Sequence, residues 1–96
     1  MTISSDSVVV ASKQQVSCDL EGDTVILHFG KGVYFGLNDV GTLVWSMLQS
    51  PMKVSHIQEA VMREYEVSVE ICQRDVLSLL TELQAQGLVE ICERAG

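Results

Sequence analysis

One corner between a strand and a helix constrains the fold of this chain more than any other feature. Residues 33–35 are valine, tyrosine and phenylalanine, which are typical of a half-buried strand. After Asn38 the apolar residues recur at steps of three and four, which predicts an amphipathic helix over residues 38–49. Asn38 is suited to cap this helix, and Asp39 places a negative charge at its positive end. The chain therefore turns from strand to helix within a few residues.

Three strands are predicted up to this corner, with alternating or β-branched residues and glycine-containing turns between them. They are residues 16–20, 24–29 and 33–37. The short link through Gly30 and Gly32 suits a tight hairpin, so we expect an antiparallel meander whose last strand lies at the edge. Residues 8–11 fit either a short strand or an ordered arm. Residues 1–7 are small and polar, and we expect them to be disordered.

Two further helices are predicted after the corner. Pro51 ends the first helix, because the residue before a proline is pushed out of the helical region. The second helix is expected to begin at Ser55, since Ser55 and Gln58 have the spacing of a capping box and Val54 is placed for a hydrophobic staple. Residues 88–91 then form either a short apolar strand or an extended tail.

The third helix is expected to be capped by Ser68, to run to about Gln86 and to end at Gly87. Its apolar arc is wider than one packing face needs. Four of its residues form one narrow stripe: Cys72, Val76, Leu79 and Leu83. Leu80 and Leu77 flank this stripe on one side. Ile71 flanks it on the other side, with Asp75 between Ile71 and the stripe. Either both flanks pack inside the protein, or part of the arc lines a groove for a ligand.

Charge and hydropathy exclude several classes of function. The chain has 96 residues, which suits one domain, and a formal net charge of −7 with six scattered basic residues. Nucleic-acid binding needs clustered Lys and Arg, and an acidic chain is repelled by DNA and anionic lipid. No apolar run is long enough to span a membrane, and no signal peptide is visible. We therefore expect a cytoplasmic protein that binds neither nucleic acid nor membrane.

No catalytic residue, metal site or cofactor is predicted. The three cysteines are odd in number and have no paired spacing, so free thiols are expected. His28 and His56 are isolated from any Cys–His or zinc-ligand motif, and His28 is interpreted as a half-exposed strand residue. The glycines of residues 30–41 lack the spacing of a phosphate-binding loop. Trp45 is expected to be structural.

Residues 34–41 with Trp45, followed by residues 75–83 and 87–88, resemble the PqqD family. The resemblance covers about residues 16–92 and is strongest to the free-standing leader-recognition proteins of lasso-peptide biosynthesis, which are RiPP recognition elements. It implies a single recognition domain over residues 1–96. The implied fold is α+β and winged helix-turn-helix-like, with a three-stranded antiparallel sheet followed by three helices.

The resemblance also implies a function. Such domains are non-catalytic and bind the leader segment of a ribosomally made precursor peptide, which adds as a strand to the edge at residues 33–37. The binding residues carried over by position are Val33, Tyr34, Phe35, Gly36, Asp75, Val76 and Leu79. Strand alternation sends only one of Tyr34 and Phe35 inward, and the flank of the third helix that faces the leader stays open.

The partners implied by the lasso resemblance are a separate transglutaminase-like leader peptidase and a macrolactam-forming lasso cyclase. Three other functions remain open. A quinone-pathway protein would instead present its peptide to a radical-SAM enzyme. A winged-helix DNA-binding protein shares the helix order, but Arg74 is the one basic residue of the third helix. A structural subunit of another assembly would bind no free peptide.

Overall fold

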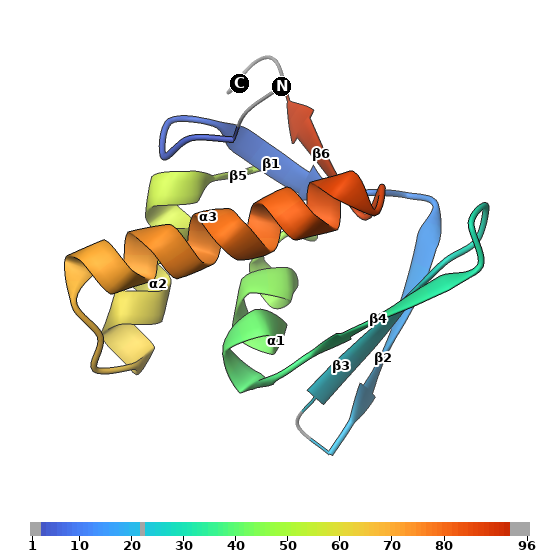
Figure 1. The fold of residues 1–96 in the computed structure, drawn as a ribbon, viewed down its shortest axis with the longest axis horizontal. Helices are drawn as coiled ribbons and strands as arrows, with labels where there is room; N and C mark the ends of the chain where they lie inside the picture. Colours follow the sequence, from blue (N-terminus) through green and yellow to red (C-terminus); the bar gives the residue numbers. More distant parts are fainter. Residues whose placement is uncertain (1–2, 22, 93–96) are drawn as a thin grey trace.

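Two three-stranded antiparallel sheets and three helices make up the fold (Figure 1). The computed structural model describes residues 3–21 and 23–92. In chain order the elements are β1 (Val8–Ala11), β2 (Gln15–Leu20), β3 (Asp23–His28), β4 (Val33–Leu37), α1 (Asp39–Met47), β5 (Met52–Lys53), α2 (Val54–Glu64), α3 (Val69–Ala85) and β6 (Val89–Cys92). The predicted α+β class is therefore confirmed. No helix in the described part of the chain is long and apolar enough to cross a membrane.

The first sheet is the predicted meander, with the strand order β2-β3-β4. β3 pairs with β4 from Thr24–Leu37 to His28–Val33, and β4 is an edge strand as expected. Gly32 adopts a φ of 63° in the hairpin between these strands, a conformation that favours glycine. The sheet therefore leaves one side of β4 without a strand partner among the described residues.

The second sheet has the order β5-β1-β6 and was not predicted as a sheet. β1 lies at its centre and pairs with β6 from Val8–Cys92 to Ala11–Val89. Both segments that were left open between strand and coil are thus strands. They pair across almost the whole length of the chain, and local periodicity carries no signal for such a partner.

The start of the chain corrects two predictions. Ile3 is only 5% exposed and belongs to the hydrophobic core, so residues 3–7 are not disordered; residues 1–2 lie outside the described residues. The Ser7 and Ser5 carbonyls accept hydrogen bonds from the Val54 and Ser55 N–H groups at 2.9 and 3.0 Å. α2 therefore begins at Val54, and the predicted capping box is wrong because the backbone of residues 5–7 satisfies the free N–H groups.

The starts of α1 and α3 and the end of α3 were predicted correctly. The Asn38 side chain accepts a hydrogen bond from the Gly41 N–H at 3.0 Å, and Ser68 caps α3 through the Ile71 N–H at 3.2 Å. Gly87 has a φ of 74° just after α3, the left-handed conformation expected there. α1 is shorter than predicted, since it ends at Met47 with Leu48 as its C-cap.

The core lies between the helices and both sheets. Trp45 is 4% exposed, and its Nε1 donates to the Ser17 Oγ at 3.2 Å, which agrees with the structural role expected for it. His28 was interpreted as half-exposed, but it is buried at the end of β3. Its Nδ1 accepts hydrogen bonds from the Gly30 and Lys31 N–H groups at 3.1 and 3.2 Å. His28 lies on the same buried face of β3 as Thr24 and Ile26, and the N–H groups of the hairpin turn satisfy its buried ring nitrogen.

Candidate functional site

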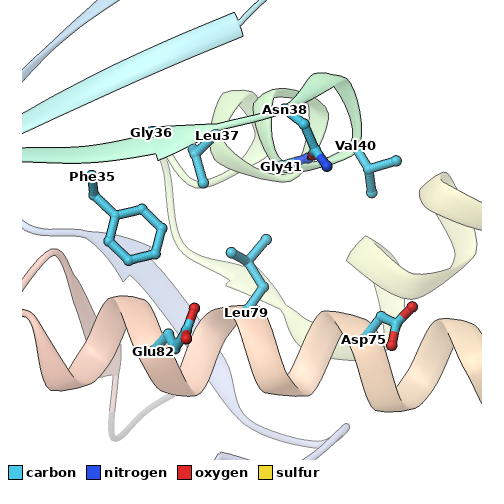
Figure 2. Close-up of a pocket in the computed structure, with 9 residues that line it drawn as sticks. All are labelled: Phe35, Gly36, Leu37, Asn38, Val40, Gly41, Asp75, Leu79 and Glu82. Carbon is cyan, nitrogen blue, oxygen red and sulfur yellow. The ribbon is translucent and has the colours of Figure 1, made fainter.

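A groove of about 410 Å³ separates β4 and the start of α1 from α3 (Figure 2). One wall is the strand-to-helix corner and the other is a face of α3. The lining residues are Phe35, Gly36, Leu37, Asn38, Val40, Gly41, Asp75, Leu79 and Glu82.

The β4 wall combines an unpaired strand edge with apolar side chains. β4 hydrogen-bonds only to β3 among the described strands, so its other edge offers backbone N–H and C=O groups. Phe35 is half-buried against the core and Leu37 is buried, whereas Tyr34 is 73% exposed on the opposite face of the sheet. Phe35 is therefore the inward-facing member of the Tyr34–Phe35 pair, and Figure 2 shows its ring directed toward α3.

The Asn38 cap and Gly41 shape the corner above the groove. Gly41 is buried, and a Cβ atom built on it would lie 3.0 Å from the Leu37 Cβ. A side chain at this position would push Leu37 away from its place in the wall. The glycine therefore allows α1 to begin directly against the last residue of β4.

The α3 wall presents Asp75, Leu79 and Glu82, which lie on one helix face because they are four and three residues apart. Figure 2 shows Leu79 directed across the groove, with the two carboxylates on either side of it. Leu80 and Leu83 are completely buried on the core side. The wide apolar arc of α3 is thus divided between the core and the groove, and Leu79 belongs to the groove side.

A smaller apolar cavity of about 100 Å³ adjoins the groove, since Val40, Asp75 and Leu79 line both. Its other lining residues are Val44, Val61, Tyr65, Val67, Ile71, Cys72 and Val76. Burial raises the pKa of the Tyr65 phenol, and the Asp39 and Glu64 carboxylates add to this effect. Burial, followed by the Asp75 carboxylate, raises the pKa of the Cys72 thiol. Both groups therefore stay neutral over the physiological range.

The groove is negatively charged and holds no catalytic constellation. Two of its lining residues, Asp75 and Glu82, are acidic and none is basic. Arg74 approaches Asp75 at the surface, with 3.4 Å from Nε to Oδ1, and both side chains are mostly exposed. Residues 3–21 and 23–92 contain no group of three His, Cys, Asp or Glu residues that could hold a metal ion. The arrangement suits binding of an extended chain through backbone bonds, apolar contact and negative charge.

The structure brings together four of the seven predicted site residues: Phe35, Gly36, Asp75 and Leu79 line the groove. Val33 lies at the start of β4, Tyr34 points to the other face, and Val76 is 3% exposed and lines the adjoining cavity instead. Five residues that line the groove were not predicted from the sequence as site residues: Leu37, Asn38, Val40, Gly41 and Glu82. The first four belong to the corner itself, and Glu82 follows Asp75 by two helical turns, so both signals were present in the sequence.

Known proteins match the chain at the level of family and of fold. The sequence profile of the family described as Coenzyme PQQ synthesis protein D (PqqD) matches residues 23–89. The structure of TbiB1 in complex with the TbiA(beta) leader peptide is similar with a TM-score of 0.78 and 31% identity, covering 91% of this chain and 99% of TbiB1. Lasso peptide synthetase B1 complexed with the leader peptide shares the fold, with a TM-score of 0.75, 23% identity and coverage of 85% and 96%. No curated protein matches significantly.

Proposed function

This chain belongs to the PqqD family, and we propose that it captures the leader segment of a ribosomally made precursor peptide during lasso-peptide maturation. The observation that carries the proposal is the free edge of β4 beside a groove of about 410 Å³. A peptide strand that pairs with this edge would enter the space between β4 and α3. TbiB1, which is 31% identical, is known in complex with a leader peptide, and this supports the assignment.

Binding would occur by strand addition, in which backbone hydrogen bonds give affinity and side-chain contacts give selection. The backbone of Val33, Tyr34, Phe35 and Gly36 would pair with the leader. Phe35 and Leu79 would pack against the leader side chains that enter the groove, and Val76 would support Leu79 from the core. Asp75 would contact the leader from the α3 wall.

The protein would act without catalysis, by delivering the leader to a separate transglutaminase-like peptidase and to a macrolactam-forming cyclase. The family description favours a second candidate, in which the bound peptide is presented to a radical-SAM enzyme for quinone-cofactor synthesis. The two candidates share the groove and differ in the peptide that fills it. The acidic α3 wall of the groove disfavours DNA binding, which depends on neutralising phosphates.

Isothermal titration with the leader and core segments of a lasso precursor peptide tests the proposal. We expect the leader to bind without metal or cofactor and the core segment not to bind. Binding to the core alone, or no binding to the leader, would contradict the proposal. Binding of a quinone-pathway precursor in place of a lasso precursor would support the second candidate.

Proline substitution tests strand addition directly, because proline removes a backbone N–H. Successive N–H groups of β4 point to opposite sides, so only one of Tyr34→Pro and Phe35→Pro removes a donor from the free edge. That variant should stay folded by circular dichroism and lose at least about tenfold in leader affinity, or roughly 1.4 kcal/mol. Two folded variants that both bind like the parent would exclude pairing at this edge.

A further inference from the structure

We propose that the groove selects leader segments that carry a lysine or arginine two residues from an apolar residue, so that both side chains enter the groove. This inference rests on the proposed function and names the class of peptide that the site would accept. It is drawn from the spacing and charge of the α3 wall.

The spacing of the α3 wall is near that of a strand on the Asp75 side of Leu79 and shorter on the Glu82 side, since these residues lie four and three positions away, about 6 and about 4.5 Å along the helix axis. Asp75 and Glu82 are seven residues apart in a helix that rises about 1.5 Å per residue, so they are about 10 Å apart along its axis, with Leu79 between them. Alternate residues of a strand lie roughly 6.8 Å apart on one face. In Figure 2, β4 and α3 run alongside each other across the groove. A peptide residue above Leu79 would therefore have its groove-facing neighbours directed toward the two carboxylates.

The centre of the groove calls for an apolar side chain. Leu79 and Phe35 project into the groove from opposite walls, both half-buried against the core, and the Phe35 ring lies on the Glu82 side of Leu79. An apolar peptide residue at this point would cover surface that is otherwise exposed to water, which is favourable in proportion to the area removed. A charged residue there would lose hydration without gaining a partner.

The carboxylates of Asp75 and Glu82, on either side of Leu79, favour a positively charged peptide side chain. No lysine or arginine lines the groove, and among residues 3–21 and 23–92 Glu82 takes part in no ion pair. Asp75 meets only Arg74, its neighbour on the helix surface, and exposed pairs of this kind interact weakly. A bound strand would displace water from the groove and so strengthen the field of both carboxylates. Lysine and arginine combine a charge that can pair with either carboxylate and an aliphatic stem that can lie along the apolar wall.

Matched peptides test the inference on the unmodified protein. Fluorescent peptides of about ten residues, long enough to span β4, would tile the leader of the lasso precursor peptide that binds in the titration above. The tightest binder would then be resynthesised with each Lys or Arg replaced in turn by norleucine, which keeps the aliphatic stem and removes the charge. We expect one replacement to weaken binding by about fivefold or more in an anisotropy titration, corresponding to roughly 1 kcal/mol. The loss should shrink as salt is raised from about 50 to about 300 mM.

Protein variants localise the effect. The double variant Asp75→Asn/Glu82→Gln should bind the parent peptide at least about fivefold more weakly than the unmodified protein does, and should bind the norleucine peptide with unchanged affinity. Glu59→Gln/Glu90→Gln is the matched control, because it removes two exposed carboxylates on α2 and β6 that do not line the groove. It should bind both peptides like the parent. Glu82→Gln alone repeats the test if the double variant does not fold.

Three results would overturn the inference while leaving the proposed function intact. The tightest peptide would contain no Lys or Arg, or every norleucine replacement would bind like the parent peptide. Alternatively, the control variant would weaken binding as much as the groove variant, and net charge alone would then explain the effect. If no leader peptide binds at all, both the inference and the proposed function fail.

Discussion

Two adjacent leucines on α3 offer a sharp test of the boundary between core and groove. Leu80 is completely buried, whereas Leu79 is half-buried and faces the groove. Leu80→Ala would leave a closed cavity and should destabilise the fold by about 3–5 kcal/mol. Full burial of a leucine is worth about 1.5–3 kcal/mol, so the loss for Leu79→Ala should be about 1 kcal/mol, because part of the side chain is already in water and the groove stays open.

For leader binding the order of the two substitutions should be reversed, with Leu79→Ala having the larger effect. A leader strand would cover Leu79, and its truncation should weaken binding by about 1–2 kcal/mol, or roughly 5- to 30-fold. Leu80→Ala should bind like the parent under conditions where it is folded. Urea unfolding followed by circular dichroism would measure stability, and isothermal titration with the leader would measure affinity.

Either of two results would refute this reasoning. If Leu79→Ala destabilises the protein as much as Leu80→Ala does, Leu79 is a core residue and the groove is shallower than the structure indicates. If Leu79→Ala is folded and binds the leader like the parent, the α3 wall is not part of the binding site. Since the two substitutions remove the same atoms from neighbouring positions, neither result can be attributed to chemistry or to helix propensity.

Four further predictions concern the scaffold. Trp45→Ala should lower the free energy of unfolding by about 3–5 kcal/mol in urea, while Trp45→Phe should cost less; equal losses would contradict the role of the buried indole. At pH 8 a thiol reagent should modify Cys18 rapidly and Cys72 only as the protein unfolds, because Cys18 is exposed, Cys72 is buried, and burial raises the pKa of Cys72. The stability that this protonated thiol contributes is fully present below the pKa of the unfolded thiol and is lost as pH rises through the pKa of the folded thiol. The urea midpoint of the parent protein should therefore fall at alkaline pH, and that of Cys72→Ala should fall less. Gly87→Ala should lower the free energy of unfolding more than Gly32→Ala does. Both glycines have positive φ, but a Cβ atom on Gly87 would lie 3.1 Å from the His28 Nε2, whereas one on Gly32 would have no neighbour within 4 Å. Equal urea midpoints for the two variants would contradict this reasoning.

Local sequence signals predicted the elements that build the groove. The caps at Asn38 and Ser68 and the left-handed Gly87 were all read correctly, because each depends on a side chain or backbone freedom within one turn of the helix end. The edge position of β4 also followed from short turns and alternation. These are the features whose physical cause lies within a few residues.

The failures have non-local causes. The start of α2 was misplaced because carbonyl groups of residues 5–7 satisfy its first N–H groups, across about fifty residues of sequence. His28 was interpreted as half-exposed because the sequence does not show that β3 turns the face of Thr24, Ile26 and His28 toward the core. The second sheet was missed because β1 finds its partners in β5 and β6, far along the chain.

The orientation of α3 shows where sequence reasoning about the site must stop. Leu79 and Leu80 both lie within the wide apolar arc, and a rotation of the helix by about 100°, one residue step, would bring Leu80 to the place of Leu79. Periodicity cannot choose between them. Contacts far along the chain hold the end of the helix: the Leu88 N–H donates to the Leu83 carbonyl at 2.9 Å, and the Ser12 N–H donates to the Leu88 carbonyl at 2.9 Å. The chain after α3 is thereby tied to β1, and β6 continues into the second sheet. The sheet that was not predicted therefore anchors the C-terminal end of α3, whose residues Leu80 and Leu83 are completely buried and leave Leu79 on the groove side.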